Sequence, residues 1–461
     1  MKVKFLGAAG TVTGSKYLLT LKSGHKVIID FGMFQGRHEI EKRNRDDYGV
    51  DFSSIDAIIL THAHLDHVGM LPILVNKGFR GKIIATPATY DIANIVLLDS
   101  AHIQEEDAEV ENRHRERRGE LPIEPLYGVQ DAVQITRRFL YPVNYGETIE
   151  VLPDFKVTFR DAGHILGSSF LEVETEGKKL IFSGDLGNKN KPVIKDPQPI
   201  VMKDADVVFL ESTYGNRNHK SVEESKRELL EAIQDTYNRG GNTLIPSFAI
   251  ERTQDILYFL REFYERGKLP PLKVFLDSPM AIETNAIFRI HKECYDEKAR
   301  KLIEQGKDLF RFPGLKITRS VQSSKEINHI KHGAVIIAGS GMCTGGRIKH
   351  HLKHNLWRDD SSLIFVGYQA KGTLGRKILE GEKMVKIYGE EISVKAKIYT
   401  IGGFSAHADR RELLSWLSTV KKGATVFNVH GEEEALSAMK DAVEDMGHEG
   451  YIPEYLEELE I

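Results

Sequence analysis

The amino-acid sequence predicts an α/β protein in which one domain is interrupted by a second α/β domain with a parallel sheet. Three observations support this fold class. The chain has 461 residues, more than one core usually holds. Residues 1–212 and 396–461 share a pattern of short apolar runs that end at polar, ligand-capable residues. Residues 213–395 instead alternate strand-like runs with helical patterns.

Five apolar runs in residues 1–212 are predicted strands, because each is rich in β-branched or aromatic residues and is followed by a turn residue. They span 26–29, 55–60, 156–159, 180–182 and 207–210. The polar residues that follow them are Asp30, the histidine-rich run 62–67, Asp161 with His164, Asp185 and Glu211. We expect these side chains to converge at one edge of a sheet.

Repeated strand, turn and helix units in residues 213–395 predict a parallel sheet, whose ligands usually bind at the strand C-termini. The predicted strands span 243–245, 274–276, 335–338 and 363–366. The residues expected to contact a substrate there, or in the basic stretch that follows, are Ser247, Arg252, Ser278, Ser340, Gly341, Arg347, Lys349, Lys371 and Arg376.

The glycine-rich segment from Ser340 to Arg347 is similar to a loop that binds phosphate at the start of a helix. It lacks the Gly-Lys-Ser/Thr ending of nucleotide-hydrolysing loops, so we expect no ATP or other nucleotide cofactor there.

The last segment returns to the first pattern. A run at 398–401 leads to His407, and a run at 425–429 ends at His430. The predicted domain limits are therefore 1–212 and 396–461 for the interrupted domain, and 213–395 for the inserted one. The stretch from Glu105 to Glu120 is dense in charges of both signs and is predicted to be a solvated helix or loop.

Composition narrows the class of protein. With 41% hydrophobic and 28% charged residues, the chain is predicted to be soluble and globular, and no apolar run approaches the roughly 18 residues of a membrane span. The net charge of −4 argues against a protein that coats nucleic acid indiscriminately, but it leaves room for a local basic channel. The two cysteines, Cys294 and Cys343, are too few for a disulfide framework and favour the reducing cytoplasm.

The run His62-Ala63-His64-Leu65-Asp66-His67 places three imidazoles and a carboxylate directly after a predicted strand. Imidazole and carboxylate suit Zn²⁺, and their burial would be costly unless a cation compensated it. One such segment cannot complete two tetrahedral sites, so further ligands must come from elsewhere. Of the 18 histidines, the only others that stand in a comparable context are His164, His407 and His430.

These residues carry a resemblance to a known family. Asp30, His62-x-His64-x-Asp66-His67, His164 and Asp185 match, in order, the motifs of the metallo-β-lactamase superfamily. Glu211, His407 and His430 look like the three additional motifs of its β-CASP branch. That branch comprises nucleases, including the RNA 3′-end-processing endonuclease of the cleavage and polyadenylation complex and the ribonuclease J group. The resemblance implies an αββα sandwich interrupted by a β-CASP domain.

The resemblance also implies roles for single residues and a cofactor of two Zn²⁺ per chain. One zinc would be bound by His62, His64 and His164, and the other by Asp66, His67 and His430, with Asp185 as a bridge. Asp30 would hold the ligands from behind. His407, oriented by Glu211, would face the scissile phosphate. The residues predicted to be catalytic are His407, Glu211, Asp66 and Asp185.

The leading hypothesis is a zinc-dependent ribonuclease, an endonuclease on single-stranded RNA that leaves 3′-hydroxyl and 5′-phosphate ends. RNA is favoured over DNA because the DNA-repair members of the branch resemble one another in having valine where this chain has His430. Endonuclease is favoured over 5′-exonuclease because no long extension follows Ile461, although some relatives do both. Dimerisation is common in the family, so a homodimer is left open.

Three alternatives compete with this hypothesis. A small-molecule thioester or lactam hydrolase would use the first motifs but leaves His407 without a role. A redox di-iron member would resemble its relatives in having glutamate at position 64, where this chain has histidine. A non-catalytic RNA-binding subunit would have lost ligands, whereas every expected ligand is present here.

Overall fold

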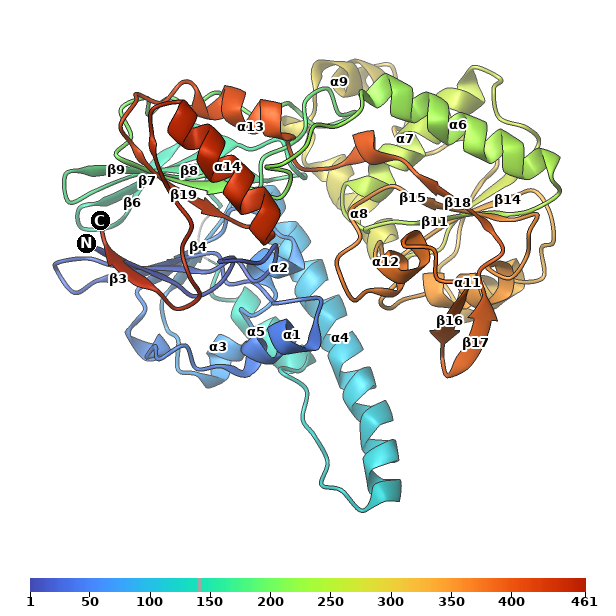
Figure 1. Ribbon diagram of the computed structural model, residues 1–461, viewed down its shortest axis with the longest axis horizontal. Helices are drawn as coiled ribbons and strands as arrows, with labels where there is room; N and C mark the ends of the chain where they lie inside the picture. The colour runs from blue at the N-terminus through green and yellow to red at the C-terminus, as the bar shows by residue number, and fades with distance from the viewer. Residues whose placement is uncertain (140–141) are drawn as a thin grey trace. The chain divides into compact units, whose positions relative to one another are not determined.

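The computed structural model describes residues 1–139 and 142–461, which form two compact units (Figure 1). Unit 1 consists of Met1–Lys189, Asp196–Asn218 and His407–Ile461. Unit 2 consists of Asn190–Lys195 and His219–Ala406. The chain therefore leaves unit 1, builds unit 2 and returns to complete unit 1.

Unit 1 is built on two sheets. The first has the order β21-β1-β2-β3-β4-β5, with strands Glu458–Glu460, Lys2–Phe5, Tyr17–Thr20, Lys26–Ile29, Ala57–Ile59 and Lys82–Ile84. The second has the order β20-β19-β10-β9-β8-β7-β6, with strands Glu449–Tyr451, Thr425–Val429, Val207–Glu211, Lys178–Phe182, Ser169–Thr175, Phe155–Asp161 and Thr148–Leu152. β19, which precedes His430, pairs in parallel with β10, which ends at Glu211.

The inner faces of the two sheets share one apolar core. It combines Phe5 and Ile29 of the first sheet with Phe159, Phe182 and Phe209 of the second. The rings of Phe182 and Phe209 stack with centroids 4.2 Å apart.

Helices cover both outer faces, which gives the αββα layers that the resemblance implies (Figure 1). On the second sheet, Trp416 of α13 (Arg410–Leu417) and Met439 of α14 (Glu433–Asp445) join a second core with Phe170. On the first sheet the helices are α2 (Leu65–Val68), α3 (Ile73–Asn76), α4 (Pro87–Arg118) and α5 (Val129–Thr136). The short α1 spans His38–Glu41.

Helix α4 has two halves of different character. It begins with Thr86 as N-cap and Pro87 in the first turn, and it ends at Gly119 with a left-handed φ of 69°. The first half buries apolar residues such as Ile92 and Val96 against unit 1. The second half is the charged stretch predicted to be solvated, and Ala108 is its only buried residue among those described. Although α4 is 32 residues long, no described helix is long and apolar enough to span a membrane.

Unit 2 is built on a sheet whose six strands all pair in parallel, in the order β13-β12-β14-β11-β15-β18. The strands are Leu315–Ile317, Lys273–Leu276, Ala334–Ala338, Thr243–Pro246, Ser362–Phe365 and Lys397–Thr400. A hairpin, β16 (Met384–Ile387) and β17 (Glu390–Ser393), stands apart from this sheet. The helices are α6 (Val222–Asn238), α7 (Arg252–Glu265), α8 (Pro279–Ile290), α9 (Glu297–Glu304), α10 (Val321–Ile327), α11 (Ile348–Asn355) and α12 (Leu374–Leu379).

The compact units divide the chain differently from the predicted limits. The run at 398–401 was assigned to the interrupted domain, but β18 pairs in parallel with β15 and so belongs to the sheet of unit 2. The chain returns to unit 1 only at His407, and the short segment Asn190–Lys195 also lies with unit 2.

Candidate metal centre

Every predicted ligand of unit 1 stands at the end of a strand or in the turn that follows it. The run 62–67 follows β4 and turns into α2, with His64 in the N-cap position. His164 follows β7, Asp185 follows β9 and His430 follows β19. In the second sheet β9, β10 and β19 run parallel and β7 points the same way, so ligands that are far apart in the chain meet in one cluster with the run that follows β4 of the first sheet.

Two glycines allow the ligand-bearing turns to approach each other closely. A Cβ atom on Gly32 would lie 1.6 Å from the carbonyl oxygen of Asp66, and one on Gly187 would lie 1.8 Å from that of Gly163. No side chain fits in either place. Gly32 thus brings the turn after β3 against the histidine run, and Gly187 brings the turn after β9 against the turn that carries His164.

The first group of ligands has the dimensions of a tetrahedral zinc site. His64 Nδ1 lies 3.2 Å from His62 Nε2 and 3.1 Å from His164 Nε2. Asp185 Oδ2 lies 3.4 Å from His62 Nε2 and 3.5 Å from His164 Nε2. Ligand atoms that bind zinc tetrahedrally at about 2.0–2.1 Å stand about 3.3–3.4 Å from one another, so the spacing fits that ion.

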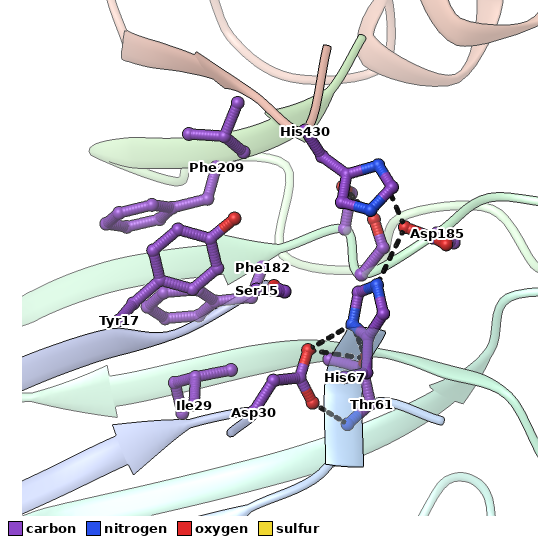
Figure 2. Close-up of a pocket in the computed structure, with 13 residues that line it drawn as sticks. Ser15, Tyr17, Ile29, Asp30, Thr61, His67, Phe182, Asp185, Phe209 and His430 are labelled. Carbon is purple, nitrogen blue, oxygen red and sulfur yellow. Dashed lines mark hydrogen bonds and ion pairs between the residues drawn. The ribbon is translucent and has the colours of Figure 1, made fainter. Parts of the chain in front are cut away.

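The second group comprises Asp66, His67 and His430, and Figure 2 shows His67 and His430 beside Asp185. Asp185 Oδ1 is 3.3 Å from His67 Nε2 and 3.6 Å from His430 Nδ1, and His430 Nε2 is 3.4 Å from Asp66 Oδ2. The ligand atoms of Asp66, His67 and His430 all lie within 4.8 Å of one another. Asp185 therefore directs one carboxylate oxygen toward each group.

The cluster contains buried polar atoms that the protein itself does not satisfy. His67 Nε2, Asp185 Oδ1 and His430 Nε2 have no hydrogen-bond partner among the described residues. Leaving such atoms buried costs about 1–3 kcal/mol each. A cation between them would satisfy all three at once, so the residues present fit a metal ion.

Asp30 and Thr61 support the ligands from behind. Asp30 Oδ2 lies 2.7 Å from His67 Nδ1, an arrangement that turns Nε2 of the ring toward Asp185 (Figure 2). Thr61 donates its backbone N–H and its hydroxyl to the two oxygens of Asp30, at 2.7 and 2.8 Å. The Thr61 hydroxyl also lies 3.1 Å from His62 Nδ1.

A small cavity of about 10 Å³ lies behind His67 and Asp185, between the two sheets (Figure 2). Tyr17, Phe182 and Phe209 form its apolar side. This volume is about that of one water molecule, so the ligands are backed by packed side chains and not by open solvent.

His407 and Glu211 form a pair beside the ligands. His407 Nδ1 lies 3.1 Å from Glu211 Oε1 and 3.9 Å from Asp185 Oδ2. Glu211 is fully buried and also accepts the backbone N–H of Leu186 at 2.8 Å. The His407 ring centroid lies 4.6 Å from that of His164, so the pair borders the first ligand group.

Within the cluster, burial favours the neutral form of some imidazole rings, whereas neighbouring carboxylates favour the protonated form of His407. Burial lowers the pKa of His62 to about 3 and that of His64 to about 4, so both rings are neutral, as metal ligands must be. Burial also disfavours a charged His407, but the carboxylates of Glu211 and Asp185 outweigh it and raise the pKa of that ring to about 9. Burial alone would raise the pKa of Asp185. The surrounding imidazoles, first among them that of His430, outweigh burial and hold this pKa well below its usual range.

The cluster is accessible from one side. Most of its side chains are buried, but those of Asp66 and His407 are each 18% exposed, and His64 is half-buried. The side chains of Asp66, His407 and His64 are therefore the parts of the cluster that solvent reaches.

In unit 2, residues predicted to contact substrate gather at the C-terminal ends of β11, β12 and β14. A Cβ atom on Gly339 would lie 3.6 Å from Ser278 Oγ and 3.8 Å from the carbonyl oxygen of Ser247. The Phe248 side chain packs against the backbone of Gly341. The structure thus brings Ser247, Ser278 and the Ser340–Gly341 turn together.

The glycine-rich loop differs in detail from a phosphate cradle. The Ser340 hydroxyl accepts the backbone N–H groups of Thr344 and Gly345, at 3.0 and 3.2 Å. Those two donors are therefore already used within the loop. The sequence pattern could not show this, because a serine in such a loop can turn inward or outward.

Two of the three predicted arginine contacts, Arg252 and Arg347, are engaged inside unit 2. Arg347 Nη1 lies 2.6 Å from Asp277 Oδ1 and also donates to the carbonyl of Thr318. Arg252 is buried and forms an ion pair with Asp255 at 2.6 Å. Both side chains hold unit 2 together in this structure.

The remaining predicted contacts lie on α11 and α12. Lys349 lies with its ammonium 4.7 Å from the ring centroid of the half-exposed Tyr388, on which His350 also stacks. Lys371 precedes α12, and Arg376 forms an ion pair with Glu380 at 2.7 Å.

Sequence reasoning missed two residues of these sites. Thr61 directly precedes the histidine run, and this position was the only signal for its contacts with Asp30 and His62. Tyr388 comes from the β16–β17 hairpin, and nothing in the sequence relates it to Lys349.

Three family models match the chain. The model of the metallo-beta-lactamase superfamily matches residues 9–237, and that of the Beta-Casp domain matches residues 253–378. A model described as a Zn-dependent metallo-hydrolase RNA specificity domain matches residues 391–453.

Several curated proteins are similar over most of their length. The chain is 42% identical to ribonuclease TTHA0252 of Thermus thermophilus over 95% of both chains. It is 31% identical to transcription termination factor FttA of Methanosarcina mazei over 96% of this chain and 69% of that protein. It is 30% identical to an RNase J-like protein of Methanocaldococcus jannaschii over 93% of this chain and 92% of that one.

Among solved structures, a protein of unknown function from Enterococcus faecalis superposes with a TM-score of 0.52 at 12% identity. The match covers 99% of both chains and shows a shared fold.

Proposed function

Because this chain belongs to the β-CASP branch of the metallo-β-lactamase superfamily, we propose that it is a zinc-dependent ribonuclease that hydrolyses phosphodiester bonds of single-stranded RNA. One observation carries the proposal. The His407–Glu211 pair borders two groups of metal-ligand side chains, and His407 lies on their accessible side. A hydrolase of esters or lactams would use the ligands but has no need of this pair.

The residues that would hold two zinc ions are assigned as follows. His62, His64 and His164 would hold one ion and Asp66, His67 and His430 the other, and Asp185 directs one carboxylate oxygen toward each group of ligands. Two zinc ions held in this way supply activated water at neutral pH and neutralise negative charge on the phosphate. Asp30 and Thr61 keep the rings of His67 and His62 in the orientation that binding requires.

His407 performs the proton transfer that hydrolysis still needs. Glu211 accepts from His407 Nδ1, and in this proposal the other ring nitrogen faces the substrate with its proton. That nitrogen donates the proton to the 3′ oxygen as its bond to phosphorus breaks. The products are a 3′-hydroxyl and a 5′-phosphate.

In this proposal, unit 2 binds the RNA. Ser247, Ser278, Ser340 and Gly341 lie together at strand ends, where the hydroxyl groups of Ser278 and Ser340 and the backbone N–H of Gly341 would contact phosphates. Lys349, Lys371 and Arg376 add positive charge. Arg252 and Arg347 contribute indirectly, because their guanidinium groups are already paired with Asp255 and Asp277. They hold the loops that carry the contacting residues in place.

We assign endonuclease as the principal activity and leave 5′-exonuclease as a second one. The two free cysteines, both buried, agree with a cytoplasmic location. A homodimer is part of the proposal.

The test uses purified protein with single-stranded RNA that is labelled either at its 5′ end or internally, beside the His407→Ala and Asp185→Ala variants. We expect internal cleavage with 3′-hydroxyl ends by the wild type and none by Asp185→Ala. Intact RNA together with turnover of a thioester would overturn the proposal. Mononucleotides released only from 5′-monophosphorylated RNA would replace the endonuclease assignment by an exonuclease.

A further inference from the structure

The second half of α4 forms an arm of unit 1 together with the chain that runs back beside it. The arm consists of residues 102–118 and the return segment 119–127 (Figure 1). Asn112 exchanges two hydrogen bonds with the backbone of Ile123, at 2.9 and 2.7 Å. Arg115 Nε donates to the carbonyl oxygen of Leu121 at 2.6 Å. The return segment therefore covers the side of the helix that carries Ala108, Asn112 and Arg115.

The opposite side of the helix is uncovered. With about 3.6 residues per turn, the positions farthest from the return segment are Ile103, Glu106, Asp107, Val110, Arg113, His114 and Arg117. We call these seven residues the outer face. Ile103 is 47% exposed and Val110 is 50% exposed. The two residues are about two helical turns apart on the same side of the helix, and such exposure is unusual for large apolar side chains.

Charge changes sign along the outer face, with Val110 at the boundary. Glu106 and Asp107 precede Val110, and Arg113, His114 and Arg117 follow it. Within the described residues, Glu106, Asp107, His114 and Arg117 have no ion-pair partner. Arg113 pairs with Glu109 at 2.7 Å, but both are well exposed, so this pair is weak and can exchange.

This pattern is complementary to itself when the helix is reversed. If a second copy lies antiparallel with Val110 against its own counterpart, Asp107 faces Arg113 and Glu106 faces His114. Ile103 then faces the aliphatic part of Arg117. A two-fold axis through Val110 repeats every contact, as a symmetric dimer requires.

We propose that the outer face of the arm is a self-association surface that pairs antiparallel with the outer face of a second copy of this chain. RNA is the less suitable occupant, because the acidic half of the face would repel a phosphate backbone as much as the basic half attracts it. The inference deepens the homodimer part of the proposed function and does not depend on the metal centre or on catalysis.

A single helix face buries less area than most stable interfaces, so the dimer should dissociate on dilution. Its charged contacts are exposed at the rim, so added salt should weaken it. We therefore expect sedimentation velocity of the full chain to show a monomer–dimer equilibrium that depends on concentration and on salt.

Charge reversal tests the pairing directly. Arg113→Glu with Arg117→Glu makes the outer face acidic, and Glu106→Arg with Asp107→Arg makes it basic. Each double variant alone should weaken the dimer by about 100-fold or more, because like charges then face each other. An equimolar mixture of the two should dimerise again, and so should the chain that carries all four changes.

Glu116→Arg is the matched control, since it changes the charge of the same helix outside the outer face and should leave the dimer intact. Circular dichroism checks that each variant keeps its helix content, and the rescue in the mixture excludes misfolding as the cause.

Three results would overturn the inference: a wild type that stays monomeric up to its solubility limit, double variants that still dimerise alone, or a mixture that stays monomeric. If the variant with Arg113→Glu and Arg117→Glu loses affinity for single-stranded RNA while its mass by sedimentation stays that of the wild type, the arm binds RNA and not a second copy. Because mass and not cleavage is measured, failure here is distinguishable from failure of the ribonuclease proposal.

Discussion

Each unit of this chain contains a cluster of buried histidine and aspartate side chains, but the two clusters compensate the buried charge differently. In unit 2, Asp277 is fully buried and accepts from Arg347, His351 and Ser324 at 2.6, 2.7 and 2.6 Å. The other ring nitrogen of His351 lies 3.0 Å from Asn328 Oδ1. The positive charge that compensates the buried Asp277 carboxylate is therefore supplied by the chain itself, through the Arg347 guanidinium.

In unit 1, no arginine or lysine pairs with Asp185 among the described residues, and ring nitrogens face its two oxygens. His67 Nε2 and Asp185 Oδ1 remain without a hydrogen bond. The comparison teaches that residue type alone does not separate a metal site from a structural cluster. What separates them is whether the protein provides the compensating charge itself.

The largest expected effect comes from removing one of the two aspartates. Asp185→Asn should abolish detectable RNA cleavage and reduce the metal content of the purified protein, because both ligand groups lose an anionic oxygen. Asp277→Asn is the matched control and should keep the metal. Metal analysis and RNA cleavage on both variants check this, and equal metal loss in the two would remove the contrast between the clusters.

His407→Ala should lower kcat by about 10²- to 10⁴-fold while the metal content stays at the wild-type value, since a proton donor and not a ligand is lost. A nitrophenyl phosphodiester, whose leaving group needs no proton, should be much less affected than RNA. An equal loss on both substrates would assign His407 to a role other than proton donation.

Arg347→Ala should destabilise unit 2 by about 3–5 kcal/mol, because Asp277 is left buried without its cation. The two tryptophans allow the units to be followed separately, since Trp357 lies in unit 2 and Trp416 in unit 1. Urea unfolding in a Trp416→Phe background reports on unit 2. A shift in a Trp357→Phe background, where Trp416 reports on unit 1, without a shift in the Trp416→Phe background would contradict the prediction.

Asp30→Asn should weaken metal binding by about 10- to 100-fold, which is the usual effect of losing a residue that orients a ligand. The measurement is a zinc titration against a chelator of known affinity. Asp51→Asn, at an exposed position of the same unit, is the control and should bind zinc like the wild type.

The smallest effect is a pH dependence confined to unit 2. Burial alone would raise the pKa of Asp277, but His351, Ser324 and Arg347 donate to it and hold its pKa below the usual value. A lowered carboxyl pKa contributes stability above the unfolded value of about 3.9, and this contribution is lost as the pH falls through the lower folded value. Urea midpoints followed by Trp357 should therefore fall more steeply with acid in wild type than in Asp277→Asn. Parallel curves would contradict this.

The convergence of side chains in the candidate metal centre could be predicted from local pattern, because they follow apolar runs that form strands, whereas their division into two ligand groups rests on the resemblance to the family. The partners of Arg347 could not be predicted, since Asp277 lies 70 positions away and only the parallel pairing of β12 with β14 brings the two strands together. The same limit applies to the run at 398–401. It resembles the strands of either unit, and its assignment to unit 2 depends on long-range pairing with β15.

The order of the ligands along the chain has a consequence for synthesis. His62 to Glu211 are translated before the main segment of unit 2, His219–Ala406, whereas His407 and His430 are translated after it. A growing polypeptide therefore carries most of the metal-binding side chains without the ring that closes the second group and without the proton donor. Under the proposed function, a nascent chain without these two histidines is expected not to cleave RNA, its own message included.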